Sequence, residues 1–218
     1  IEKKFDELNL IYEQMTKNEK TKVLGFRGLM EQYLRAEDYH HAFIYGETLF
    51  KLSPNIDKIY ETLVNLIGKT NNWQNLLTIS EKAYALKLID KKTFETNKSI
   101  ALYEIATIKA ESESKESLKL IEKALELRRN FSPYVLFYIE LLIKNNKLNL
   151  AKKTFKKIWQ ESPHPELKPL VKKLANALKI GFYTLSRDIT YNSKDFKDSK
   201  ILLTESLIEE AKWSEAKK

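Results

Sequence analysis

Apolar residues recur along this chain at spacings of three and four, which is the period of helices that bury one face. The clearest stretch is 132–165, SPYVLFYIELLIKNNKLNLAKKTFKKIWQESPHP. Its second half carries small and apolar residues at fixed offsets, namely Leu148, Ala151, Phe155 and Ile158. Pro163 follows, and proline ends a helix because it lacks a backbone N–H and its ring clashes with the preceding turn. The pattern predicts two helices packed as a pair.

The same frame returns elsewhere, which is typical of a repeat protein. A second copy begins near Val23 and closes at Pro54, and a third begins near Asp57 with the turn GKTNN between its two apolar stripes. These copies resemble the tetratricopeptide repeat, in which a small residue lets two helices approach and an aromatic residue four positions later fills the gap. We therefore predict an all-α fold, a tetratricopeptide-like α-solenoid of antiparallel helix pairs.

The frame predicts one superhelical domain over 1–218. Its parts, in chain order, are a partial helix at 1–17, repeats at about 23–56, 57–90, 92–131 and 132–165, an irregular unit at 166–196 and a partial unit at 197–218. Trp213 and Ala216 look like the start of a further helix. Because solenoids need polar capping units at their ends, we expect the chain to be a fragment of a longer protein.

Composition narrows the function classes. The chain has 43% apolar residues, five Gly, five Pro and no Cys. The lack of Cys excludes disulfides, thiolate metal sites and a cysteine nucleophile. The longest apolar runs are too short to span a bilayer, and the first residues do not resemble a signal peptide.

The charge balance is 38 Lys and Arg against 30 Asp and Glu, a net +8. Lys alternates with Glu on the predicted helix faces, whereas nucleic-acid binders concentrate basic residues and stacking aromatics in a patch. We therefore expect no nucleic-acid partner. The run AKKTFKKIW places four lysines, Lys152, Lys153, Lys156 and Lys157, on one side of a helix. We interpret them as a solvated face, with anionic lipid as the alternative.

Five segments stand out as a set: KTKVLGFRGLM, AEDYHHAF, KLIDKKTFETNKSIAL, WQESPHPELKPL and SKILLTESLIEEAKWSEAKK. Taken together they resemble the soluble part of HemY-family proteins, the tetratricopeptide proteins associated with protohaem synthesis in proteobacteria. The resemblance implies a non-catalytic scaffold whose partners are haem-biosynthesis enzymes. It also implies a parent protein tethered to the bacterial inner membrane by an N-terminal segment absent here, with the repeats in the cytoplasm. A haem or porphyrin carrier and an assembly factor for envelope proteins are the alternative functions.

In a solenoid of this kind the first helix of each pair lines the concave surface, so its non-core positions are expected to contact a partner. The predicted groove residues are Arg27, Glu31, Lys58, Glu61, Asn65, Leu102, Tyr103, Leu136, Phe137 and Glu140. Glu31, Leu102 and Tyr103 interrupt the Lys, Asn and Arg set by which chaperone-binding tetratricopeptide domains grip a carboxylate, which argues against such a clamp. The groove suits a helix or an extended segment with one hydrophobic face. The alternative is that its four apolar residues pack between repeats.

Candidate chemistry is sparse. His40, His41 and His164 are of the type that ligates haem iron, but their places at a helix start and in the turn SPHPE favour solvated or capping roles. No serine lies in a nucleophile elbow. Gly25 and Gly28 fall inside a predicted helix, where they favour close helix packing rather than a phosphate cradle. We predict no catalytic residue, no metal site, no cofactor and no enzyme activity.

Overall fold

A computed structural model describes residues 2–213, with side chains from Phe5 onward. These residues form twelve α-helices, one short 3-10 helix and no strand, so the predicted all-α class is confirmed. The first helices are α1 (Glu2–Thr16), α2 (Lys22–Arg35), α3 (Tyr39–Leu52), α4 (Ile59–Thr70), α5 (Trp73–Ala85) and α6 (Lys91–Lys109). They continue with α7 (Ser114–Leu127), α8 (Ser132–Lys144), α9 (Leu148–Glu161), η1 (Pro165–Leu167), α10 (Lys168–Leu178), α11 (Phe182–Ile189) and α12 (Lys197–Glu209).

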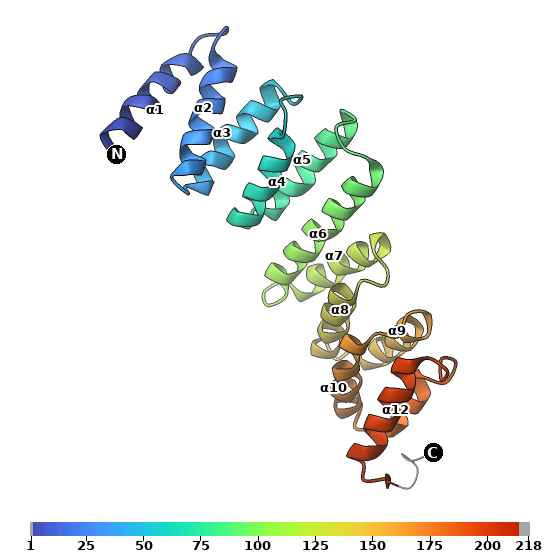
Figure 1. Cartoon of the computed structure of the whole chain (residues 1–218). Coiled ribbons are helices and arrows are strands. Elements are labelled where there is room, and N and C mark those ends of the chain that lie inside the picture. Colours follow the sequence, from blue (N-terminus) through green and yellow to red (C-terminus); the bar gives the residue numbers. More distant parts are fainter. Residues whose placement is uncertain (1, 214–218) are drawn as a thin grey trace. The chain divides into compact units, whose positions relative to one another are not determined.

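Within each half of the chain, successive helices lie as antiparallel neighbours joined by short turns (Figure 1). Helices α2 and α3 fall in the range 23–56 and α8 and α9 in the range 132–165, each pair within one sequence repeat. The connection between α11 and α12 covers 190–196, because α12 begins at Lys197. Trp213 follows the end of α12, and Ala216 lies outside the described residues. Each of these two ranges therefore holds one helix pair.

Helix ends are set by side-chain caps and by left-handed turns. Asp38 accepts a hydrogen bond from the backbone N–H of His41 at 3.1 Å, and Asp90 accepts one from Thr93 at 2.7 Å. Seven described residues other than glycine have a positive φ: Glu37, Lys58, Asn71, Lys87, Asn146, Lys179 and Ala211. After Lys87, the N–H of Leu88 bonds back to the carbonyl of Ala83 at 2.9 Å, the pattern that closes a helix C-terminus.

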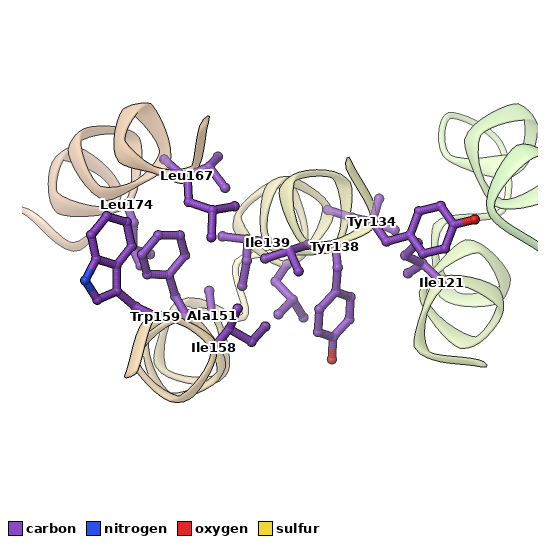
Figure 2. Packing of buried hydrophobic residues seen from close by; sticks show 14 of the residues in the cluster. Ile121, Tyr134, Tyr138, Ile139, Ala151, Ile158, Trp159, Leu167 and Leu174 are labelled. Carbon is purple, nitrogen blue, oxygen red and sulfur yellow. The ribbon is translucent and has the colours of Figure 1, made fainter. Parts of the chain in front are cut away.

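Contacts between Cα atoms divide the chain into two compact units, 1–101 and 102–218. Each unit has its own hydrophobic core. The first is built around Phe50, Leu63 and Ile67. The second gathers residues of α7 to α12 around α8 and α9, where Figure 2 shows Ile139, Ile158 and Trp159 among the packed side chains. Burial of these apolar faces drives the packing of helices that carry few other constraints.

The two glycines of LGFRG lie where α1 meets α2. A Cβ on Gly28 would lie 2.3 Å from the ring of Tyr12, and one on Gly25 would lie 2.8 Å from the backbone N of Thr16. Such distances are shorter than any van der Waals contact, so only glycine permits this approach of the two helices. The predicted packing role of both glycines is confirmed.

Candidate partner-binding surface

In the first unit, the predicted groove residues lie on α2 and α4. Arg27 is exposed on α2, and its Nε donates a hydrogen bond to Oε1 of Glu31 at 2.9 Å. Glu61 and Asn65 are exposed on α4 and share one face because they are four residues apart. Lys58 does not belong to this face. It precedes α4 with a left-handed φ of 59°, since the turn from the preceding pair still occupies that position.

In the second unit, Leu102 and Tyr103 pack inward. Leu102 is only 6% exposed and belongs to the core, so it is not available to a partner. The ring of Tyr103 stacks on that of Tyr134, with centroids 4.8 Å apart, and meets the edge of Phe137 at 5.6 Å. Burial, with a smaller contribution from Glu104, raises the pKa of Tyr103. Leu102 and Tyr103 therefore pack between helices, as in the alternative interpretation of the predicted groove.

Leu136, Phe137 and Glu140 lie on α8 with different exposures. Leu136 and Phe137 are half-buried and pack against the core, whereas Glu140 is exposed. Phe137 and Glu140 also line a recess of about 370 Å³, the Phe137 recess, together with Ala110, Glu111, Leu141, Ile143, Lys144 and Lys173. These residues come from α8, α10 and the turn that follows α6, and α8 and α10 are first helices of their pairs. The structure thus brings two predicted residues into one hollow.

Two ion pairs border the Phe137 recess. Nζ of Lys173 lies 2.7 Å from Oε1 of Glu140, and Nζ of Lys144 lies 2.8 Å from Oε2 of Glu111. All four side chains are at least 47% exposed, so these pairs are of the solvated kind. Sequence reasoning missed Lys144, Lys173 and Glu111. Lys173 falls in the irregular unit predicted at 166–196, for which no groove position was assigned.

The three histidines take local roles. The ring Nδ1 of His41 lies 2.7 Å from Oδ2 of Asp38, the cap of α3. The ring Nδ1 of His164 accepts a hydrogen bond from the backbone N–H of Glu166 at 3.3 Å, which caps η1. His40 is exposed beside His41. In the part of the chain that the structure describes, no group of three or more His, Asp and Glu residues is placed to hold a metal ion.

The helix pairs share one burial frame. The fourth and eighth residues of α3, α5, α7 and α9 are buried in every case, among them Ala42 and Ala151 at the fourth position and Ile121 and Phe155 at the eighth. The chain is a tetratricopeptide-like α-solenoid. A repeated small or apolar residue at these two positions lets each second helix sit close to its partner, as the sequence pattern predicted.

Comparison with known proteins adds little beyond the fold. No family model and no curated protein matches the chain. Among solved structures, it is similar to a thermophilic tetratricopeptide-repeat protein of Thermus thermophilus. The identity is 13% and the TM-score 0.36, over 83% of this chain and 96% of that one. The resemblance to the HemY family therefore gains no support from these matches. Within residues 2–213, none of the helices is both long enough and apolar enough to cross a bilayer.

Proposed function

We propose that this protein is a non-catalytic scaffold that binds a protein partner through the first-helix face of its second unit. The observation that carries the proposal is the Phe137 recess, a hollow with an apolar floor on the helices that α-solenoids commonly present to partners. An apolar side chain of a partner fits such a hollow because it would cover the half-buried side chains of Phe137 and Ile143 from water.

The charged residues around the recess indicate which groups the partner should carry beside its apolar side chain. Glu140 and Lys173, and likewise Lys144 and Glu111, are paired in solvent, where such a pair contributes about 0–1 kcal/mol. Exchanging one of these pairs for a charged group of the partner therefore costs little. The expected ligand is a segment with one apolar anchor flanked by charged residues, held in a helix or an extended conformation.

The identity of the partner is a finer proposal, and the resemblance of five sequence segments to HemY-family proteins supports it. On that basis the partners are haem-biosynthesis enzymes and the parent protein is associated with the inner membrane. Arg27, Glu31, Glu61 and Asn65 would supply a second, charged contact area on the first unit. The haem-carrier alternative would use the apolar end of the predicted groove, where Leu102 is buried and the ring of Tyr103 stacks on Tyr134.

The test is affinity capture from detergent-solubilised membranes and cytosol with the purified chain as bait, followed by mass spectrometry. A variant with Lys144→Glu and Lys173→Glu gives the recess an all-acidic border. The matched control carries Lys119→Glu and Lys123→Glu, exposed changes on α7 outside the recess with the same net charge. Haem-biosynthesis enzymes retained by the wild type and the control but lost by the recess variant would support both proposals. Retention of other specific proteins in the same pattern would support the recess alone, and identical retention by all three would refute it.

A further inference from the structure

A second hollow lies elsewhere on the same unit and shares no residue with the Phe137 recess. It is a groove of about 600 Å³, the Tyr138 groove, between α7 and α9. Leu125 of α7, Ile158 and Leu150 of α9 and Tyr138 of α8 give it an apolar lining. Figure 2 shows the ring of Tyr138 pointing away from α8, with Ile158 reaching toward it from α9. Leu150 is 42% exposed and Leu125 is half-buried, so these two side chains are the part of the apolar lining that solvent reaches, while Tyr138 and Ile158 are buried.

The hydroxyl of Tyr138 is held in place at the bottom of the groove. It donates a hydrogen bond to Oε1 of Glu122 at 2.8 Å. Burial, and then this hydrogen bond to a carboxylate, raises the pKa of Tyr138 well above its ordinary value, so the group stays a neutral donor. This hydrogen bond fixes the ring of Tyr138 relative to α7, so ordering that side chain adds little to the entropy cost of binding.

The two walls of the groove carry opposite charges. Glu122 and Glu126 lie four residues apart on α7, and Lys153 and Lys157 lie four residues apart on α9. Beyond them the signs exchange, with Arg129 after α7 and Glu161 at the end of α9. Among the described residues, the ion pairs of α9 run from Lys152 and Lys156 to Asp188, and none joins the two walls. Glu122 is held by the hydrogen bond from Tyr138, whereas Glu126, Lys153 and Lys157 form no ion pair among the described residues and can meet a charged partner.

The lining decides between classes of partner. Three carboxylates and three basic groups leave the groove without net charge, which disfavours nucleic acid and anionic lipid. An extended peptide would bring its backbone N–H and C=O groups against helices whose own backbone is already paired, and would leave them unsatisfied. A helix satisfies its own backbone and presents side chains at the same four-residue spacing as the walls.

We propose that the Tyr138 groove docks an amphipathic helix of a partner protein, with an apolar edge flanked by basic residues on one side and acidic residues on the other. The basic flank faces Glu122 and Glu126, and the acidic flank faces Lys153 and Lys157. The apolar edge covers Leu150 and the half-buried Leu125, beside the buried Ile158 and Tyr138. This contact is independent of the Phe137 recess, so the scaffold would hold two proteins at once.

The test uses three synthetic helical peptides of about 15 residues, long enough to form a helix, labelled with fluorescein. All share one leucine stripe. The mixed probe has Lys on one flank and Glu on the other, the basic probe has Lys on both, and the acidic probe has Glu on both. By fluorescence anisotropy with the full chain, the mixed probe should bind about tenfold more tightly than either single-sign probe, since each of those places like charges together on one side.

Charge reversal of one wall supplies the sharper test. In Lys153→Glu with Lys157→Glu, both walls are acidic, so the basic probe should become the tightest binder. The control with Lys119→Glu and Lys123→Glu has the same net charge and should keep the wild-type order. Equal affinities for the three probes, no binding of any, or the same change in both variants would overturn the proposal. So would a dimer of the chain, seen by sedimentation, that the wall variant alone abolishes, because a second copy would then be the occupant.

Discussion

The indole Nε1–H of Trp159 on α9 donates a hydrogen bond to Oγ of Ser199 on α12, across 2.9 Å. Both side chains are completely buried, and the hydroxyl of Ser193 lies 3.3 Å from that of Ser199. Forty residues separate the two partners in the chain. The bond therefore ties the last described helix to the core of the second unit through a polar contact that water does not reach.

This bond predicts a specific stability loss. Ser199→Ala leaves the N–H of Trp159 buried without an acceptor, which should lower the free energy of unfolding by about 1–3 kcal/mol. Urea denaturation followed by far-UV circular dichroism measures it. In a double-mutant cycle, Ser199→Ala should cost much less when Trp159→Phe is already present. Equal costs in both backgrounds would show that the hydrogen bond is not the cause.

The glycines predict opposite effects of the same substitution. Gly25→Ala places a Cβ 2.8 Å from backbone atoms of Tyr12 and Thr16, which cannot move separately from α1. We expect a loss of roughly 1–3 kcal/mol from the strain of overpacking. At Gly68 on α4 no atom lies within 4 Å of the added Cβ, so Gly68→Ala should gain roughly 0.5–1 kcal/mol. Thermal unfolding of the two variants compares them directly, and a shift of the same sign in both would contradict the packing account.

Asp188 predicts a pH-dependent contribution to stability. Its carboxylate lies 2.7 Å from Nζ of Lys152 and 2.5 Å from Nζ of Lys156, and hydrogen bonds from these two lysines lower its pKa. A lowered folded pKa stabilises the folded state above the unfolded pKa, near pH 4, and the gain is lost as pH falls through the folded value. Because the side chain is 34% exposed, we expect only about 1 kcal/mol.

Asp188→Asn provides the measurement. The free energy of unfolding of the wild type should exceed that of the variant at pH 7, and the difference should shrink as pH falls below the unfolded pKa of Asp188 and through its lowered folded pKa. Paired urea titrations across this range would test it. A difference that stays constant with pH would mean that the substitution acts through packing rather than through the ion pairs.

The cap of α3 predicts the difference between two substitutions at one position. Asp38 accepts a hydrogen bond from the backbone N–H of His41, and this bond is the main cause of its lowered pKa. Asp38→Ala removes the acceptor and should cost about 0.5–2 kcal/mol. Asp38→Asn keeps an acceptor and should cost less, although the contact with the ring of His41 loses its charge. Chemical denaturation of both variants at pH 7 checks the order.

Much of the fold was predictable because one physical pattern repeats. Small or apolar residues at two fixed places in each second helix appear in the sequence as Ala42 and Ala151, and the structure buries both. A helix pair is also a local structure, so its period is visible without knowledge of distant contacts. Gly25 and Gly28 likewise predicted a close approach of two helices, although the sequence did not identify Tyr12 as the residue that packs against them.

The candidate sites were less predictable because they depend on distant parts of the chain. Leu102 was expected on the surface, but α6 is longer than its neighbours, and the resulting orientation turns this residue into the core. The four lysines of AKKTFKKIW were expected on one solvated side. In the structure, Lys152 and Lys156 form ion pairs with Asp188 on α11. Lys153 and Lys157 line the Tyr138 groove instead. The sequence of α9 alone does not show which lysines pair with Asp188 and which face the groove.

The left-handed residues at the helix ends have a consequence for engineering the protein. Glu37, Lys87, Lys179 and their counterparts hold a backbone conformation that costs L-residues roughly 1 kcal/mol more than glycine. Packing of the helices, rather than local preference, therefore imposes these turns. Replacing any one of these three residues with glycine should therefore raise the melting temperature. None of the three lines the Phe137 recess or the Tyr138 groove. The thermal limit of this scaffold is thus adjustable independently of what it binds.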